Sequence, residues 1–499
     1  MKTKAILYAL VTGIILVTFL FPGCNKFLDI PPQGQLTQED FPKTASDALL
    51  ATNATYESLR EWFYHCGGYP ILDIMSDDAS KGSNQNDQLA TVGPYNTFQH
   101  TPTQDGLDRW WNALYEGVKR TNVVIEKVPA INMDTVIRNR YIAEAKFIRG
   151  LLYFDLVRAW GGVPLVLTTN PPVKLPRSTA DEIYLQVIKD LTYAIVYLPE
   201  KSQYGADDAG RATKGAAKAL LAKVYLFRHN FPDAETLLLQ VINSNEYSLE
   251  PLFINANGVD GNNGIESVFE IGALQVEGTE SGGNQYANTQ GVRGSPNKGW
   301  GFNRPTENLR GSFEPGDPRL KGTIIDLGDT IDGVPIIGDG PTPDVTKDGN
   351  GNIIEVECYN RKVWVPGDNT ITQWGHHRRI LRYADVLLMA AEALNENGKQ
   401  SQALTYLNMV RERARQGNNS ILPDIITTDQ ALLSDTIMLE RRHELAMEGC
   451  HRFWDLVRTG RAAAILGPLG FVTGKHELLP IPQSEIDISQ GTLTQNPNY

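Results

Sequence analysis

The first residue whose neighbours suggest a covalent reaction is Cys24. A short positive region precedes an uninterrupted apolar run from Ala5 to Phe21, which ends at Pro22-Gly23-Cys24. This order is typical of an export signal, and a helix-stopping proline followed by Gly-Cys is typical of a lipoprotein cleavage site. We therefore predict a signal peptide over residues 1–23 and a Cys24 thiol that carries a diacylglyceryl group.

The same segment could instead be a transmembrane anchor, because a run of this length lies at the short end of what spans a bilayer. Phe21 and Pro22 also depart from the small residues usual just before such a Gly-Cys pair. Lipidation would hold the chain on a membrane, since each buried CH₂ contributes about 0.8 kcal/mol and one cysteine carries several acyl chains.

The other three cysteines, Cys66, Cys358 and Cys450, are an odd number with wide spacing. This pattern does not favour a disulfide framework, and the lack of a CxxC pair argues against structural zinc. Cys450 stands among apolar residues in a helical pattern, which predicts a small buried side chain.

Two further patterns could bind metal ions. His376-His377 stand where we expect a helix to begin, but adjacent side chains point apart and no acidic third ligand has a suitable spacing. The second pattern runs from Asp348 to Asn352. Its sixth position is Ile353, where an EF-hand needs glycine, and its twelfth is Tyr359, where it needs glutamate. We predict a hairpin turn from Val345 to Ile353, no metal site and no cofactor, with calcium elsewhere in this region as the alternative.

No sequence motif supports an enzyme. The chain lacks a GxSxG elbow, an HExxH zinc motif, a P-loop and a GxGxxG turn after a strand. A glycosidase would need two carboxylates about 5–9 Å apart in a cleft, and a sequence with 58 acidic residues does not reveal such a pair.

A dense series of charged residues marks the C-terminal part of the chain. Its members are Glu440, Arg441, Arg442, Glu444, Glu448, Arg452, Asp455 and Arg458. We predict ion pairs and helix caps that fix the C-terminal helices to the rest of the protein, rather than catalytic groups. Trp110 and Trp111 are adjacent in a helical pattern, so at least one of them should lie in the core.

The whole chain must supply the elements that position these residues. Its 499 residues, 41% hydrophobic and 21% charged, are typical of a folded protein and exclude wholesale disorder. The formal charge of -12, more negative still without Lys2 and Lys4, argues against nucleic acid as a partner. After Cys24 no apolar stretch approaches membrane length, so everything that follows is predicted to be a soluble body tethered by its first residue.

Most of the predicted elements are helices. Apolar residues recur at multiples of three and four from Ile137 to Trp160, where a Gly-Gly-Val-Pro sequence ends the helix. Thr179 and Glu182 form a capping box that opens a helix through Leu198. Two more helices are expected over residues 213–229 and 233–243.

These helices predict a repeat of hairpins. Residues 220–234 are similar to residues 387–403, because in each a helix with small alanines turns into a second helix with Ala and Leu on its inner face. Small residues let paired helices pack closely, as in a tetratricopeptide-like hairpin of about 34 residues. We predict a mainly α fold in which up to four hairpins, over about 44–246 and 380–465, form a curved scaffold.

A large insertion separates the two helical parts. From about 247 to 375 the sequence is rich in Gly, Asn, Asp, Thr and Pro, with short apolar pieces. We predict irregular loops and short strands here, and so large an irregular segment usually has a function.

Several stretches together resemble the SusD/RagB family of Bacteroidetes surface lipoproteins. They run nearly from end to end and include Phe27-Leu28-Asp29, Trp111–Tyr115, Ala143–Gly150, Arg382–Ala393, Glu448–Arg458 and Leu479–Pro482. Each is weak alone, and their number and order carry the likeness. Asn498 and Ser489-Gln490 depart from the pattern usual near the family's C-terminus.

The resemblance implies a non-catalytic lipoprotein, anchored to the outer membrane through Cys24 and facing the cell exterior. Such a protein captures oligosaccharides and delivers them to a SusC-like TonB-dependent transporter. The alternatives are a RagB-like peptide-binding lid of such a transporter and a structural gating lid with no ligand affinity of its own.

The resemblance also implies that ligand contacts come from the loops after the first helix and from the insertion. In the first loops the apt aromatic, amide and charged residues are Tyr64, Tyr69, Asp77, Asp78, Asn84, Tyr95 and Asn96. In the insertion they are Tyr286, Asn288, Arg293, Asn297, Trp300, Phe302 and Arg304. Aromatic faces stack on sugar rings, and Asn, Asp and Arg bind their hydroxyls. Trp300 is the first candidate, because glycines on both sides leave its face open; the alternative is that it packs the insertion onto the helices.

Overall fold

The computed structural model describes residues 41–275, 283–367 and 374–499. The predicted signal peptide and Cys24 lie outside the described residues. Within the described ranges, no helix is both long and apolar enough to cross a membrane.

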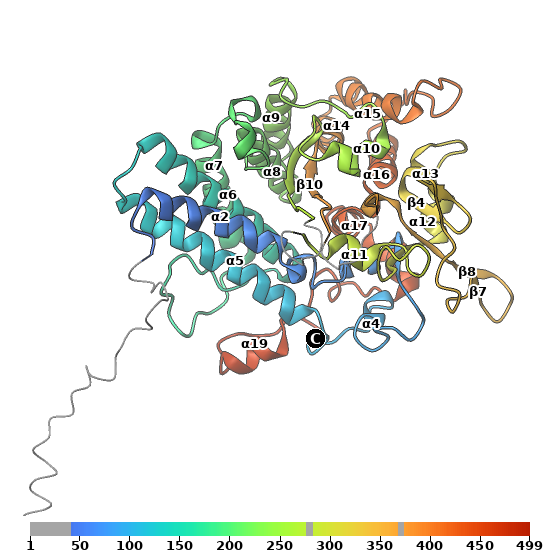
Figure 1. Cartoon of the computed structure of the whole chain (residues 1–499), viewed down its shortest axis with the longest axis horizontal. Helices are drawn as coiled ribbons and strands as arrows, with labels where there is room; N and C mark the ends of the chain where they lie inside the picture. The colour runs from blue at the N-terminus through green and yellow to red at the C-terminus, as the bar shows by residue number, and fades with distance from the viewer. Residues whose placement is uncertain (1–40, 276–282, 368–373) are drawn as a thin grey trace, which may run out of the picture.

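Helices dominate the described chain (Figure 1), which confirms the predicted mainly α fold. The long helices are α2 (Ala45–Arg60), α5 (Leu107–Lys127), α6 (Thr135–Trp160), α7 (Ala180–Tyr197), α8 (Lys214–Phe227), α9 (Phe231–Ile242), α14 (Tyr383–Glu396), α15 (Gln400–Arg415), α16 (Gln430–Leu445) and α17 (His451–Arg458). The short helices are α3 (Ile71–Ile74), α4 (Gly93–Asn96), α10 (Phe253–Asn257), α11 (Tyr286–Gln290), α12 (Glu307–Ser312), α13 (Arg319–Thr323), α18 (Ala462–Leu466) and α19 (Gln483–Ile488).

Eight of these long helices, all except α16 and α17, pack in the four predicted hairpins, which follow one another in an arc (Figure 1). The pairs are α2 with α5, α6 with α7, α8 with α9, and α14 with α15. Local capping explains where several of them begin. The Thr179 hydroxyl accepts a hydrogen bond from the Glu182 backbone and the Glu182 carboxylate reciprocates, as predicted, and Thr213 caps α8.

One pair of strands joins the beginning of the insertion to its end. Strand β2 (Ser267–Ile271) pairs antiparallel with β10 (Arg378–Arg382), and α14 packs against α9 across the base of the insertion. The two helical parts are therefore neighbours although about 130 residues of sequence separate them. The expectation that His376-His377 precede a helix is wrong, because backbone pairing with β2 keeps residues 378–382 extended until α14 begins at Tyr383.

Within the insertion the chain forms short two-stranded sheets. These are β4 (Ile324–Asp326) with β9 (Cys358–Asn360), β5 (Thr330–Ile331) with β6 (Val334–Pro335), and β7 (Val345–Lys347) with β8 (Ile353–Val356). The last pair confirms the predicted hairpin. In its turn the Asp348 carboxylate accepts backbone hydrogen bonds from Asn350 and Asn352, both at 2.8 Å.

One buried apolar cluster runs through the helical parts, from Leu59 to Ile481. Trp110 and Trp111 are both in it, with ring centroids 5.0 and 5.2 Å from that of Trp160. Cys450 is buried as predicted, but it immediately precedes α17 with φ +66° instead of lying within a helix.

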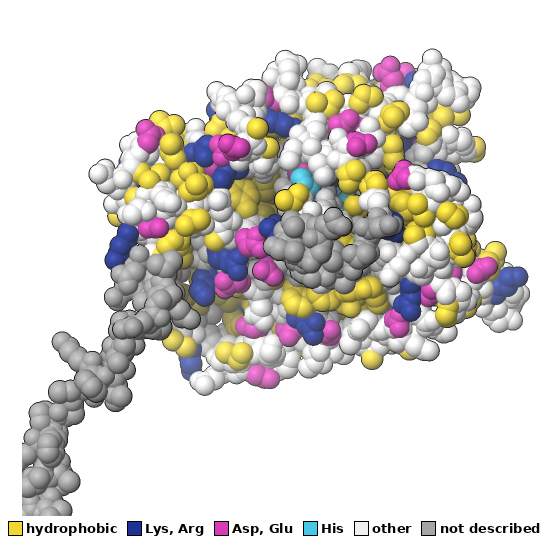
Figure 2. Space-filling model, viewed as in Figure 1, with side chains coloured by type: hydrophobic (Ala, Val, Ile, Leu, Met, Phe, Trp, Pro, Cys, Tyr) yellow, Lys and Arg dark blue, Asp and Glu magenta, His cyan; other side chains and the backbone are white. Residues whose placement is uncertain are grey.

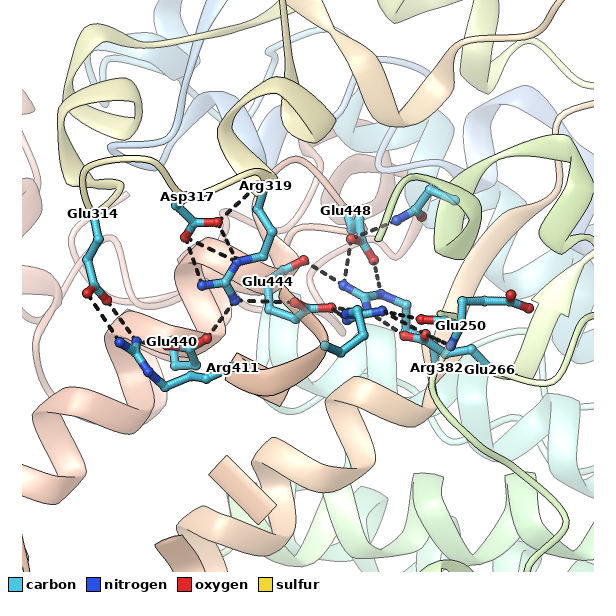
Figure 3. A network of polar contacts seen from close by, with 12 residues as sticks. Glu250, Glu266, Glu314, Asp317, Arg319, Arg382, Arg411, Glu440, Glu444 and Glu448 are labelled. Atoms are coloured by element: carbon cyan, nitrogen blue, oxygen red, sulfur yellow. Dashed lines mark hydrogen bonds and ion pairs between the residues drawn. The ribbon is translucent and has the colours of Figure 1, made fainter. Parts of the chain in front are cut away.

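Charged side chains join the insertion to the C-terminal helices in a buried network (Figure 3). Arg382 contacts three carboxylates, those of Glu266 at 2.7 Å, Glu444 at 2.5 Å and Glu448 at 2.8 Å. Arg319 of α13 similarly binds Glu440 of α16 at 2.6 Å. The predicted structural role of the charged series is confirmed.

Candidate functional site

Backbone pairing of two distant segments builds the candidate site. Strand β1 (Ala79–Gly82) pairs antiparallel with β3 (Phe302–Pro305), and Gly82 lies opposite Phe302. The approach is close, because a Cβ at Gly82 would meet the Gly301 carbonyl oxygen at 2.5 Å. The pairing therefore sets the loops after α2 beside the insertion, as expected for a shared site.

Five aromatic side chains meet where these segments join, and we call them the aromatic platform: Trp62, Phe63, Tyr69, Trp300 and Phe302. The Trp62 ring centroid lies 4.9 Å from Phe63, 5.6 Å from Tyr69 and 5.7 Å from Trp300. Tyr69 contacts Phe302 at 4.8 Å. Phe302 is buried, whereas the other four are half-buried and so keep part of each ring in solvent. Figure 2 shows a band of hydrophobic side chains on this face, near the position of α11 in Figure 1.

The loop after α2 presents the first half of the platform. A single 3-10 turn, η2 (Trp62–Tyr64), follows α2 and leads into Cys66-Gly67-Gly68, whose φ angles are all positive. The Trp62 indole N–H donates to the Gly68 carbonyl at 2.7 Å and to the Thr289 hydroxyl at 3.1 Å. These bonds fix the indole plane, and they tie the loop to α11 of the insertion.

Backbone contacts explain the glycines around Trp300. A Cβ at Gly299 would lie 2.2 Å from the Asn288 carbonyl oxygen, and Gly301 has φ +72°. The backbone N–H of Trp300 donates to the same Asn288 carbonyl at 2.8 Å. The glycines therefore let the chain run close to α11, which is a more specific role than leaving the indole uncovered.

Polar groups surround the platform. Arg293 donates to Ser83 at 2.7 Å, pairs with Asp339 at 2.7 Å and also binds Asp87. Partial burial would raise the pKa of Asp87, but hydrogen bonds from Arg293 and Ser83 outweigh it and lower that pKa. Burial raises the pKa of Tyr69, so its phenol keeps its proton and can donate a hydrogen bond.

A buried ammonium shapes the loop that carries Asn84. Lys81 Nζ donates to the carbonyls of Gly82 and Asn84 at 2.9 Å and of Asp87 at 2.8 Å. Asn84 is half-buried and Asn297 is exposed, so both amides are at least partly accessible to solvent.

Several predicted site residues lie in the core instead. Tyr95 donates to the Asp105 carbonyl at 2.9 Å, and Tyr286 packs between His65 and His376. Asp77 and Asp78 are buried in ion pairs with Arg442 at 3.0 and 2.6 Å. These four side chains support the loops and have almost no exposed surface, so the site proposed below omits them.

The remaining residues of the two segments also have structural partners. The Asn96 side chain accepts from the Lys81 backbone N–H at 3.1 Å, and buried Tyr64 donates to Asp155 at 3.3 Å. Buried Arg304 pairs with Glu355 at 3.3 Å. Asn288 is buried, and its backbone carbonyl, described above, is what contacts Trp300.

A separate open cleft of about 600 Å³ lies elsewhere on the described chain. It lies between α2, the loop 207–211 and the edge of β2, and it contains His377 Nδ1 2.5 Å from a Glu270 carboxylate oxygen. Burial alone would raise the pKa of Glu270, but the His377 hydrogen bond and Arg379 lower it to about 2. Its aromatic residues are Phe269, which is buried, and Tyr56, which is half-buried and whose hydroxyl already donates to the Glu144 carboxylate at 2.8 Å. The platform is therefore the better surface for a sugar ring.

One cluster in the described chain has metal-ligating atoms close together. Ligand atoms of Glu314, Glu440 and His443 lie within 4.8 Å of one another. Arg411 pairs with both carboxylates at 2.7 Å, and Arg319 pairs with Glu440. These guanidinium groups already neutralise the carboxylates, so the cluster does not fit a cation.

Comparison with known proteins shows to which family the chain belongs. Residues 265–499 match the model described as "SusD family", and residues 40–226 match the model described as "Starch-binding associating with outer membrane". A solved "Laminarin binding SusD-like protein" is 30% identical, with a TM-score of 0.76 over 92% of this chain and 100% of its own. The chain belongs to the SusD/RagB family.

Other relatives agree over nearly the full length of this SusD/RagB-family chain. "SusD-like protein P38" of Formosa agariphila is 27% identical over 98% of both chains. "Surface glycan-binding protein A from Bacteroides thetaiotaomicron in complex with laminarihexaose" is 25% identical, with a TM-score of 0.75 over 92% of this chain and 100% of its own.

The sequence analysis missed two members of the aromatic platform, Trp62 and Phe63. Their signal was present as three consecutive aromatic residues, Trp62 to Tyr64, which follow α2 closely in sequence. Arg109 was also missed, and its guanidinium lies 5.0 Å above the Phe63 ring while pairing with Asp105 at 3.1 Å.

Proposed function

We propose that this protein binds an oligosaccharide on the aromatic platform. The observation that carries the proposal is the convergence of four half-buried rings, Trp62, Phe63, Tyr69 and Trp300, from segments more than 200 residues apart in sequence. An aromatic surface with amides and charged groups at its rim suits a sugar, whose ring has apolar faces and a polar edge.

The expected affinity is modest. A few stacking contacts contribute about 0.5–1.5 kcal/mol each, and hydrogen bonds add similar amounts. Their sum of about 4–8 kcal/mol corresponds to roughly millimolar to micromolar dissociation constants. Such weak binding suits a protein that passes its ligand on.

Family membership supports the finer parts of the proposal. We propose that Cys24 is acylated and that residues 24–499 form a single domain on the outside of the outer membrane. The protein then delivers its ligand to a SusC-like TonB-dependent transporter. The protein binds and transfers without catalysing a reaction. A RagB-like peptide binder and a lid without its own ligand are the competing functions.

Calorimetric titration of the mature, lipid-free chain from Asn25 tests the proposal. Laminarin oligosaccharides are the first probes, because two similar proteins are named for laminarin or were solved with laminarihexaose. Starch, plant and mucin oligosaccharides and peptide mixtures complete the panel. Saturable binding of a glycan supports the proposal, peptide binding alone favours the RagB-like function, and no binding to any probe contradicts capture by the isolated protein.

A further inference from the structure

Two cysteines that are 384 residues apart in sequence meet in the protein core. Cys66 Sγ lies 3.3 Å from Cys450 Sγ, and the two residues are 5% and 1% exposed. Cys66 stands in the loop between η2 and α3, and Cys450 immediately precedes α17. The buried thiol of Cys358 contacts the Pro305 carbonyl oxygen instead, also at 3.3 Å.

Both cysteines hold a backbone conformation that normally favours glycine. The φ angle is +54° at Cys66 and +66° at Cys450. Glycine is the next residue after Cys66 and the residue just before Cys450, yet neither left-handed position uses it. These two backbone conformations bring both sulfur atoms to the same point in the core.

The contact also has the geometry from which a covalent bond can form. A disulfide bond is about 2.05 Å long, so the two sulfur atoms need to approach by little more than 1 Å. Small rotations of two side chains can supply that movement. Disulfides persist in secreted and cell-surface proteins, where thiols are not kept reduced.

We propose that Cys66 and Cys450 form a disulfide bond in the exported protein. The inference rests on the export that belongs to the proposed function, but it is independent of glycan binding. Forming the bond removes two protons and two electrons from the two thiols. An oxidised dithiol protein of the cell envelope accepts the electrons by thiol–disulfide exchange.

The exchange takes place in two steps. The Cys66 thiolate attacks the disulfide of the oxidant, forms a mixed disulfide and releases one thiolate of the oxidant. The Cys450 thiolate then attacks the Cys66 sulfur and displaces the second thiolate, which leaves the oxidant as a dithiol. Burial raises the pKa of the Cys450 thiol in the folded protein, so the exchange precedes burial and occurs while the chain folds.

The bond would fasten the loop of the platform to the C-terminal helices. Trp62 and Tyr69 flank Cys66 closely in sequence, and Cys450 lies at the start of α17. A cross-link here limits how far the first half of the platform can move away from the scaffold.

Peptide mapping of the full chain, recovered from the envelope of bacteria that export it, tests the proposal. The protein is quenched in acid, unfolded in N-ethylmaleimide without reductant and digested with trypsin. We expect peptide 61–81 to be linked to peptide 443–452, and Cys358 to be alkylated. Reduction should release the two peptides with one new thiol each. The Cys358→Ser variant should keep the linked pair, and Cys66→Ser should leave Cys450 alkylated.

Two results would overturn the proposal. One is complete alkylation of Cys66 and Cys450 before reduction in protein recovered from the outer membrane. The other is a linked peptide that contains Cys358. Both readings come from the unsubstituted chain, so they hold even where a variant fails to accumulate. Glycan titration of the same preparation separates the two proposals, because exported protein that binds glycan with both thiols free contradicts the disulfide alone.

Discussion

Replacing Trp300 by alanine should weaken glycan binding without unfolding the protein. Trp300 is half-buried, and its ring meets Trp62 edge-on with an interplanar angle of 75°. A sugar ring that covers roughly 60 Å² of the indole gains about 1.5 kcal/mol at about 25 cal/mol per Å². Loss of that contact corresponds to a dissociation constant about tenfold larger.

The assay is calorimetric titration with the glycan that the unsubstituted chain binds best. Trp300→Phe should retain part of the stacking surface and lose only about threefold in affinity. Tyr197 is a suitable control position, because it is 43% exposed on α7, far from α11 in Figure 1. Tyr197→Ala should bind as the unsubstituted chain does.

A folded Trp300→Ala protein that binds within about twofold of the unsubstituted chain would refute the reasoning. Its fold is checked by circular dichroism and by the melting temperature. Equal losses of glycan affinity in Trp300→Ala and Tyr197→Ala would also refute it, because the loss would then not depend on a residue of the platform.

Four further outcomes are expected. Arg382→Met removes one of the cations that neutralise buried Glu266, Glu444 and Glu448, and should lower the free energy of unfolding by about 3–5 kcal/mol in urea titrations. Burial would raise the pKa of Glu448, but Arg382 outweighs it and lowers the pKa to about 2 from 4.5. The resulting stability of about 3 kcal/mol is present above pH about 4.5 and should be lost as the pH falls toward 2 in urea titrations across that range. Gly299→Ala should weaken glycan binding in titration while keeping every aromatic ring, because its Cβ would lie 2.2 Å from the Asn288 carbonyl oxygen. Burial raises the pKa of Asp73 from 3.8 to about 7, so stability falls as the pH rises through that interval, and Asp73→Asn should melt at a higher temperature than the unsubstituted chain at pH 8.

The helical part of the fold was predictable because its signals are local. The capping box at Thr179, the periodicity that ends at Trp160 and the small alanines of the hairpins each depend on residues a few positions apart. The extended backbone after His377 was not predictable in this way, because β10 is held by hydrogen bonds to β2, more than 100 residues earlier.

The candidate site was predictable only in part. Tyr69, Trp300 and Phe302 were identified from residue type and family resemblance, and the structure brings them together. Tyr95 and Tyr286 have equally suitable side chains but are buried, because neighbouring elements cover them. Residue type alone does not distinguish an exposed aromatic ring from a core one.

The amino-acid sequence by itself determined the helices, their caps and the hairpin scaffold, since helix formation depends on contacts within about four residues. The tertiary structure alone decided which aromatic rings reach solvent and which polar groups pair in the core. Pairing of β1 with β3 and the meeting of Cys66 with Cys450 join residues hundreds of positions apart. Such contacts follow from the packing of the whole chain, and no local pattern in the sequence specifies them.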